Sequence, residues 1–539
     1  MKALTAAEMR EVDRLTTERF DVSGLALMET AGKSAAEVFL EQYTHKNTEP
    51  PGRVCVLCGK GNNGGDGFVV ARHLREEAEH VEVCLFAQPE ELRGDAAKNF
   101  ARWRDQGGRV THIQNEAEWE QAWPQIAAAE VIFDALLGTG IRGGASGLPA
   151  QAIEDLNRLS QNATGAHPAW IVAVDTPSGL PSDGEAAVGP VVRAHLTVTF
   201  TAPKLGQLIS PDAGCCGQLV VRSIGSPAAL VEEIGNSHVR WAGPDEFAGL
   251  PLVRAAEAHK GSYGHVLLVA GSVGKTGAAV LAGQAALRGG AGLVTLATPE
   301  PALASVVAAQ AEYMTEALPS TASGTIAAEA IRSGRFAAAL HGKTVLAIGP
   351  GLSTHPETQE FVRSAVAHTD LPIVLDADGL NAFAGFVDLL PKRKSAHVVL
   401  TPHPGEMARL LGVSSAQVQD KRVQTALESA RQWNAHVVLK GFHTVLASPA
   451  GEVFINTTGN AGLAKGGSGD VLTGLLAAVV AQFGIRDFLR VLALGVYLHG
   501  LAAELLSQQS DASGILAGEV AHAIPFARRK LLQELQERA

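Results

Sequence analysis

The sequence predicts an α/β protein with two domains, the first built on a parallel β-sheet covered by helices on both faces. Its 539 residues exceed the size of one ordinary hydrophobic core. Short apolar runs that suit buried strands alternate with helical patterns along most of the chain. The alternation stops once, between Ser226 and Pro251, where Gly-Pro and Leu-Pro pairs interrupt it. We therefore expect domains at 1–226 and 250–535, with a connector at 227–249.

The first half contains five strand-like runs with helical segments between them. The expected strands are Val54–Leu57, Val81–Phe86, Val131–Leu136, Ile171–Val174 and Thr197–Phe200, and the clearest helical segments are Phe68–Glu79 and Ala150–Leu159. Thr5 and Glu8 have the spacing of a capping box, which predicts a helix start near the N-terminus.

In the second half the alternation restarts at Gly264. The expected strands are His265–Ala270, Leu293–Ala297, Val345–Ile348, Ile373–Asp376, Val398–Thr401, Val437–Lys440 and Thr444–Ala447. Long apolar helices are expected at Val471–Gln482 and Phe488–Leu506.

Composition argues against several classes of protein. The net charge is −11, aromatic residues make up 5%, and no long basic run occurs, so we expect no nucleic-acid partner. Charges interrupt the N-terminus at once, which argues against a signal peptide, and the apolar run Leu475–Val480 is too short to span a bilayer. Five cysteines, with Cys55 and Cys58 inside a predicted buried strand, favour a reduced core. We expect a cytoplasmic protein that does not bind membranes.

The most informative motif is Gly59-Lys-Gly-Asn-Asn-Gly-Gly-Asp-Gly67, between a predicted strand and a predicted helix. Its glycines allow a ligand to approach the backbone closely, and the N-terminus of the following helix attracts phosphate. Asn62, Asn63 and Asp66 add polar side chains beyond what a turn requires, so we interpret this segment as a binding site.

Two further motifs follow predicted strands of the first half. Asp134-Ala-Leu-Leu-Gly-Thr-Gly-Ile-Arg-Gly143 ends in a G-x-G-x-x-G pattern, which leaves a dinucleotide loop and a simple glycine loop equally open. Asp175-Thr-Pro-Ser-Gly179 follows the next strand. Ligands of open parallel sheets bind at the carboxyl ends of the strands, so the three motifs are expected to converge on one pocket.

Together these motifs resemble the NAD(P)H-hydrate epimerase family over residues 9–225, although the usual proline before the two asparagines is Gly61 here. The resemblance implies a Rossmann-like three-layer domain with Asp175 as a substrate contact, and Asp175 is our candidate for proton transfer. It implies a potassium ion held by Asn63, Asp134 and Ser178. The other implied substrate contacts are Asn62, Asn63, Gly64, Gly65, Asp66, Gly138, Thr139, Gly140, Ile141, Arg142, Gly143 and Gly144.

The second half has four glycine-rich or polar segments, three that follow predicted strands and one that opens a predicted helix. They are Gly349-Pro-Gly351, Thr401-Pro-His-Pro-Gly-Glu406, Lys440-Gly-Phe-His-Thr444 and Gly467-Ser-Gly-Asp470, the last opening an apolar helix. Backbone N–H groups at that helix start can stabilise a phosphoryl group in transfer, and Asp470 can handle a proton. Gly271-Ser-Val-Gly-Lys-Thr276 does not complete a phosphate loop, because Val269 stands where that motif needs glycine.

This half resembles the ribokinase-like superfamily and, within it, the ADP-dependent NAD(P)H-hydrate dehydratases, over residues 250–535. The resemblance implies that hydrated nicotinamide nucleotide contacts Ala278, Gly351, His403 and Asp470. It implies that ADP contacts Lys440, Gly441, Phe442, His443, Thr444 and Gly469, with Mg²⁺ accompanying the nucleotide.

The two resemblances together indicate a bifunctional enzyme of metabolite repair, an isomerase joined to a lyase. Its expected ligands are hydrated NADH and NADPH and ADP, and a homo-oligomer is expected. Three alternatives are considered. A small-molecule kinase would share the Gly-x-Gly-Asp motif, an interaction module could reuse the first fold, and a dehydrogenase would rest on one G-x-G-x-x-G pattern.

Overall fold

The computed structural model describes residues 1–44, 47–140, 143–161 and 169–538 and divides the chain into two compact units, Met1–Ser237 and His238–Ala539. The predicted connector, 227–249, is split between them. Helix α8 (Ala228–Ile234) belongs to the first unit. Strand β8 (Val239–Trp241) pairs with β17 (Val453–Asn456) in the second unit. The irregular composition of this segment predicted only a connector, but it contains a short helix and a short strand.

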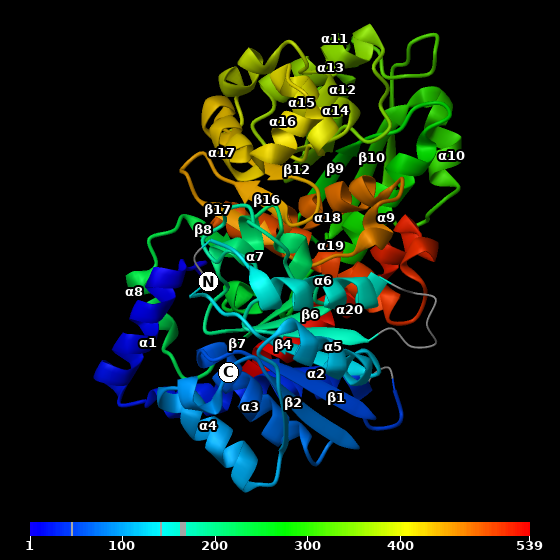
Figure 1. The fold of residues 1–539 in the computed structure, drawn as a ribbon. Coiled ribbons are helices and arrows are strands. Elements are labelled where there is room, and N and C mark those ends of the chain that lie inside the picture. The colour runs from blue at the N-terminus through cyan, green and yellow to red at the C-terminus, as the bar shows by residue number, and fades with distance from the viewer. Residues whose placement is uncertain (45–46, 141–142, 162–168, 539) are drawn as a thin grey trace. The chain divides into compact units, whose positions relative to one another are not determined.

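The first unit contains a seven-stranded parallel sheet in the order β3-β2-β1-β4-β5-β6-β7 (Figure 1). The strands are β1 (Arg53–Cys58), β2 (His80–Leu85), β3 (Arg109–His112), β4 (Val131–Ala135), β5 (Trp170–Val174), β6 (Leu196–Phe200) and β7 (Gln218–Arg222). All five predicted strands are confirmed. The sequence analysis missed β3 and β7, which form the two edges of the sheet and carry partly exposed polar residues.

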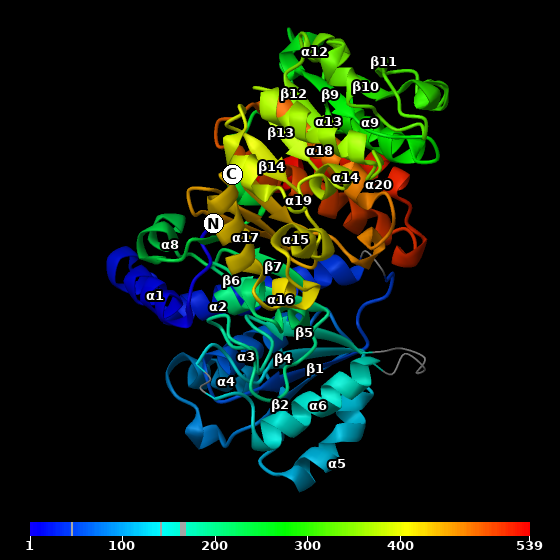
Figure 2. The same ribbon diagram turned by 90° about the horizontal axis from the view of Figure 1, so that it is seen from above.

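Alternation of side chains along β1 makes this unit three-layered. Val54 and Val56 pack into one apolar cluster and Cys55 and Leu57 into another, on the opposite face of the sheet. Helices α2 (Gly24–Thr44), α3 (Asn62–Leu74) and α4 (Gly94–Asp105) supply the first cluster. Helices α5 (Glu116–Ala127) and α6 (Gly147–Gln161) supply the second and lie together on one side of the sheet (Figure 2). The capping box predicted at Thr5 and Glu8 is present at the start of α1 (Ala6–Phe20), and α7 (Leu205–Ile209) follows β6.

The second unit contains a ten-stranded sheet in the order β11-β10-β9-β12-β13-β14-β15-β16-β17-β8. Its further strands are β9 (His265–Val269), β10 (Leu293–Pro299), β11 (Met314–Leu318), β12 (Val345–Ile348), β13 (Ile373–Leu375), β14 (Val398–Leu400), β15 (His436–Leu439) and β16 (Thr444–Ala447). The pairs from β11 to β15 are parallel, whereas β16 is antiparallel to both of its neighbours. The seven predicted strands are confirmed, whereas β11 and β17 were not predicted.

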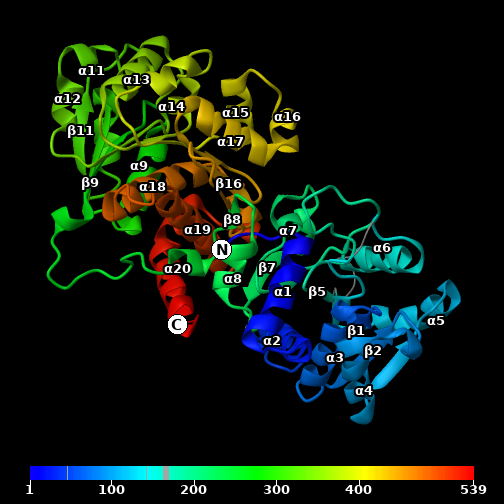
Figure 3. The same ribbon diagram turned by 90° about the vertical axis from the view of Figure 1, so that its left-hand side faces the viewer.

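Helices α9 (Thr276–Gly289), α18 (Ser468–Phe483), α19 (Phe488–Ser507) and α20 (Ala517–Arg538) form the main apolar core on one face of this sheet (Figure 3). Helix α19 is long and apolar enough to cross a membrane by length and composition, and 78% of its apolar window is buried inside the unit. The remaining helices are α10 (Leu303–Val307), α11 (Glu329–Arg332), α12 (Arg335–Leu340), α13 (Pro356–His368), α14 (Asp378–Asn381), α15 (Pro404–Leu411), α16 (Ser415–Asp420) and α17 (Arg422–Trp433).

Candidate active sites

The three motifs of the first unit follow β1, β4 and β5, which are neighbours in the sheet. Chain order reverses between β1 and β4, so the segments that follow these two strands leave a crevice at their carboxyl ends. A cavity of about 770 Å³ lies there. The motif residues that line it are Gly59, Lys60, Gly61, Asn62, Asn63, Asp66, Leu136, Leu137, Gly138, Thr139, Gly140 and Asp175.

The first motif turns into a helix earlier than the sequence predicts. Helix α3 begins at Asn62, not near Phe68, so Asn63 and the two glycines after it form its first turn. A Cβ on Gly64 would lie 1.9 Å from the carbonyl oxygen of Gly59, and one on Gly65 would lie 2.6 Å from the sulfur of Met28. These two glycines therefore permit close packing, while Asn62, Asn63 and Asp66 face the cavity.

The glycine loop after β4 lies only partly at the cavity. Gly138, Thr139 and Gly140 line it. Gly144 has a positive φ of 83°, and a Cβ there would lie 1.6 Å from the carbonyl oxygen of Val188, so it packs against that segment. Gly143 also has positive φ. Two other predicted contacts, Ile141 and Arg142, lie outside the described residues.

Asn63, Asp134 and Ser178 form an oxygen-rich cluster beside the cavity. The buried carboxylate of Asp134 accepts hydrogen bonds from Ser178 Oγ at 2.5 Å and from Ser178 N at 2.7 Å. Asn63 Nδ2 donates to the carbonyl oxygen of Leu137 at 2.9 Å. Asn63 Oδ1 is buried, and none of the described residues donates a hydrogen bond to it. Burial raises the pKa of Asp134 to about 6, although the bonds from Ser178 act in the opposite direction.

Asp175 forms a buried ion pair that the sequence analysis did not identify. Its backbone has a positive φ of 61°, and its carboxylate accepts hydrogen bonds from Lys204 Nζ and from Thr199 Oγ1 at 3.0 Å. Gln207 Nε2 fixes the backbone by donating to the carbonyl oxygen of Asp175 at 2.7 Å. The side chain of Lys204 is 1% exposed, and a buried ammonium is retained only when it is paired. A lysine close after β6, the strand beside β5, was the signal available in the sequence.

In the second unit, the buried carboxylate of Asp376 connects four site elements. Asp376 directly follows β13 and is 1% exposed. Its Oδ1 accepts hydrogen bonds from Lys440 Nζ and Thr401 Oγ1, each at 2.7 Å, and its Oδ2 accepts one from Thr473 Oγ1 at 2.7 Å. These hydrogen bonds connect the ends of β13, β14 and β15 with the first turns of α18. The sequence analysis placed Asp376 at the end of a strand and did not recognise it as a site residue.

Burial and the charges around Lys440 together shift the pKa of the predicted catalytic aspartate, Asp470. Lys440 Nζ also lies 3.7 Å from Glu406 Oε2. Burial alone would lower the pKa of Lys440, but the carboxylates of Asp376 and Glu406 raise it. Burial, together with the negative charge of Asp376, raises the pKa of Asp470 to about 6 despite the attraction of Lys440. Asp470 lies in the first turn of α18, so it can exchange a proton near neutral pH beside a helix N-terminus.

Four other predicted residues of the second unit lie at three places in the structure. His403 is the N-cap of α15, where its Nδ1 accepts the N–H of Gly405 at 3.0 Å, and its ring stays half exposed. A Cβ on Gly351 would lie 3.0 Å from Cβ of Ala278, which places these two side by side. A Cβ on Gly469 would lie 3.4 Å from Lys440 Nζ.

The segment from Gly441 to Thr444 joins β15 to β16. Gly441 has a positive φ of 145° and His443 one of 51°. The rings of Phe442 and His443 stack with their centroids 4.0 Å apart, and Phe442 is 61% exposed. This aromatic surface is of the kind that suits a flat base.

Metal ligands of the His, Cys, Asp and Glu type are not clustered in threes or more anywhere among the described residues. Cys55 and Cys58 are buried as free thiols in β1, as expected for core cysteines. Lys275, in the segment rejected as a phosphate loop, lies 3.6 Å from the carboxylate of Asp378.

Comparison with known proteins identifies the family. Residues 266–526 match the family described as NAD(P)H-hydrate dehydratase, and residues 24–206 match the YjeF-related protein N-terminus. The bifunctional NAD(P)H-hydrate repair enzyme Nnr of Moorella thermoacetica is 40% identical over 536 residues, which cover 99% of this chain and 98% of that protein. The chain belongs to the bifunctional NAD(P)H-hydrate repair enzymes. The repair enzyme of Thermofilum pendens is 36% identical over 99% of this chain and 98% of its own length.

One solved structure is similar to part of this chain. The ADP/ATP-dependent NAD(P)H-hydrate dehydratase from Bacillus subtilis, co-crystallised with ATP and Mg²⁺, is 34% identical and covers 54% of this chain and 99% of its own, with a TM-score of 0.47.

Replacing Asp376 by asparagine should disable the second unit of the repair enzyme. The change removes the charge that pairs with buried Lys440, so we expect ADP-dependent regeneration of NADH, followed by absorbance, to fall by about 100-fold or more. Asp388→Asn is the control, because its carboxylate forms an exposed ion pair with Lys392. Activity of Asp376→Asn within twofold of the parent would contradict the assigned role.

Proposed function

We propose that the first unit interconverts the R and S epimers of hydrated NADH and NADPH, and that the second dehydrates the S epimer. The second reaction consumes ADP and yields NAD(P)H, AMP and phosphate. The observation that carries this proposal is the match to named bifunctional repair enzymes over 99% of the chain. It is supported by the clustering of Asp376, Lys440, Gly469 and Asp470 in the second unit.

In the dehydratase site, Asp470 takes the proton of the substrate hydroxyl at C6 as the oxygen attacks the β-phosphorus of ADP. AMP leaves, and the N–H groups of residues 466–469 stabilise the charge of the transferred phosphoryl group. The C6–O bond then breaks with help from the ring nitrogen lone pair, phosphate departs, and loss of a C5 proton restores the dihydronicotinamide. Ala278, Gly351 and His403 hold the substrate in this scheme.

ADP occupies the segment from Lys440 to Thr444 together with Gly469. The exposed ring of Phe442, which stacks on His443, provides a surface for the adenine base. Mg²⁺ binds with the nucleotide and neutralises charge on its phosphates, as is usual for ions held by one or two carboxylates and phosphate oxygens.

In the epimerase site, Asp175 exchanges protons with the substrate in the 770 Å³ cavity. Potassium is held by Asn63, Asp134 and Ser178, whose oxygen donors suit a hard cation. The unpartnered oxygen of Asn63 and the buried carboxylate of Asp134 support this assignment. When bound, the ion balances the charge of Asp134 and fixes the loop after β4. A cytoplasmic homo-oligomer that binds neither nucleic acid nor membranes completes the proposal.

A mixture of the two epimers of hydrated NADH tests both activities in one experiment. With Mg²⁺ and ADP, we expect absorbance of the dihydronicotinamide to reach the level that corresponds to both epimers, because the first unit resupplies the S form. If the NADH formed corresponds to the S epimer alone, the epimerase assignment is contradicted. A phosphorylated product that persists with ATP would instead support a small-molecule kinase.

Potassium should stabilise the first unit by binding the folded state. We expect the melting temperature to rise by a few degrees when choline chloride is replaced by KCl at equal ionic strength, the size expected for a ligand at several times its dissociation constant. Asn63→Ala should lose this difference, because it removes the oxygen that lacks a protein donor. An equal rise in the parent and in Asn63→Ala would rule out the site.

A further inference from the structure

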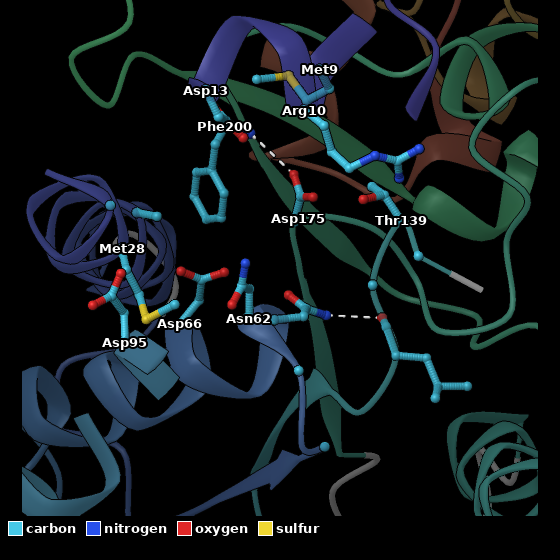
Figure 4. Close-up of a pocket in the computed structure, with 18 of the residues that line it drawn as sticks. Met9, Arg10, Asp13, Met28, Asn62, Asp66, Asp95, Thr139, Asp175 and Phe200 are labelled. Atoms are coloured by element: carbon cyan, nitrogen blue, oxygen red, sulfur yellow. Dashed lines mark hydrogen bonds between the residues drawn. The ribbon is translucent and has the colours of Figure 1, made fainter. Parts of the chain in front are cut away.

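Five acidic residues line the cavity of the first unit, and two of them, Glu91 and Asp95, form ion pairs with exposed lysines. The other three carboxylates come from three different elements. Asp13 comes from α1, Asp66 from α3 and Asp175 from the end of β5, and all three line the cavity (Figure 4). The ammonium of Lys204 is bonded to Asp175. Asp13 and Asp66 lie partly buried near this ion pair, and burial makes their ionisation unfavourable.

One carboxylate oxygen of Asp13 is buried in the protein. Its Oδ1 is buried, and none of the described residues donates a hydrogen bond to it. Burial raises the pKa of Asp13 to about 6; Asp175 acts in the same direction and Lys204 in the opposite one. Asp66 faces Asp13 from α3 and also has a raised pKa, first through burial and then through the charges of Asp175 and Asp13.

Arginines of the same helix complete the charged surroundings of Asp13. Arg10 and Arg14 line the cavity, and Arg14 is engaged by Glu11 and Glu18 on the outer face of α1. The environments of Asp13 and Asp175 thus differ in kind. Asp175 is paired with the ammonium of Lys204, whereas Asp13 has a buried oxygen to which none of the described residues donates. Two carboxyl groups in such different environments can act as the acid and the base of one reaction.

We propose that Asp13 is a catalytic residue of the epimerase site and serves as the proton donor that works with Asp175. The proposal rests on the proposed epimerase function. Asp175 accepts the proton of the C6 hydroxyl, the C6–O bond becomes a carbonyl, and the electrons of the C6–N1 bond move to N1. Asp13 donates its proton to N1, which leaves a ring-opened aldehyde.

Ring closure then inverts the configuration at C6. The aldehyde rotates about the C5–C6 bond, and N1 attacks its other face. Asp13 takes the proton back from N1, and Asp175 returns its proton to the oxygen. No proton, electron or second substrate is consumed, so the step balances as an isomerisation. The N-terminal helix α1, which ends before the family match at 24–206 begins, thereby supplies part of the active site.

The test uses the full chain with the R epimer of hydrated NADH and no ADP, so that only epimerisation is observed. Formation of the S epimer is followed by chromatography after subtraction of the uncatalysed rate. In the parent, kcat/KM should fall as the pH rises through about 6, because the donor must carry its proton. Asp13→Asn should lower kcat by about 100-fold, leave KM within about threefold, and lose this pH dependence.

Asp21→Asn is the matched control. Asp21 is an exposed aspartate at the C-cap of the same helix with φ of 56°, a conformation that asparagine accepts. It should behave as the parent does. Asp66→Asn should lower activity but retain the pH dependence near 6, and loss of this dependence in Asp66→Asn but not in Asp13→Asn would overturn the assignment.

Each remaining outcome decides one question. A parent enzyme that does not interconvert the epimers would refute the proposed function itself. An active parent with parental kcat in Asp13→Asn would refute only the role of Asp13. Thermal unfolding shows whether Asp13→Asn folds. If it does not, a parent profile that is flat between pH 5 and 8 overturns the proposal, and a declining limb that Asp13→Glu retains supports it.

Discussion

A buried aspartate–lysine pair at the carboxyl ends of parallel strands underlies each active site of this repair enzyme. In the first unit Asp175 follows β5 and is bonded to Lys204, and in the second Asp376 follows β13 and is bonded to Lys440. A charge taken out of water is costly unless an opposite charge and further hydrogen bonds accompany it. Threonines meet this requirement in both units, Thr199 in the first and Thr401 and Thr473 in the second.

A further carboxyl group that can hold a proton lies near each pair. The lysine of the pair lowers the pKa of that group, but burial outweighs this attraction. Asp13 in the first unit and Asp470 in the second both have a pKa raised to about 6, with burial as the leading cause. Both reactions need a group that gives or takes a proton near neutral pH. The same physical arrangement therefore serves an isomerisation in one unit and a phosphoryl transfer followed by elimination in the other.

Much of the fold could be predicted from the sequence, because buried parallel strands produce continuous apolar runs between helical patterns. The predicted strands are present, while the edge strands β3, β7 and β11 were missed because half-exposed edges lack such runs. Helix α3 begins at Asn62 and not near Phe68 as predicted. Gly64 and Gly65 are typical of a loop in sequence, but here they allow the first turn of the helix to pack closely. β8 and α8 were hidden in the irregular segment 227–249.

The motifs located the sites, but not every residue in them. Asn63, Asp134 and Ser178 come together as the resemblance implies. Lys204 and Asp376 are isolated in sequence from the glycine-rich motifs, and only the pairing of strands brings them to Asp175 and Lys440. Asp13 lies on a helix whose sequence pattern predicts nothing beyond its cap.

The most direct test of this account compares Lys204→Met with Lys440→Met, with both reactions measured on each preparation. If each pair supports its own site, Lys204→Met loses interconversion of the epimers but still regenerates NADH from the S epimer with ADP. Lys440→Met shows the reverse. Loss of both reactions in a folded single variant, or of neither, would contradict the claim that each activity depends on its own buried pair.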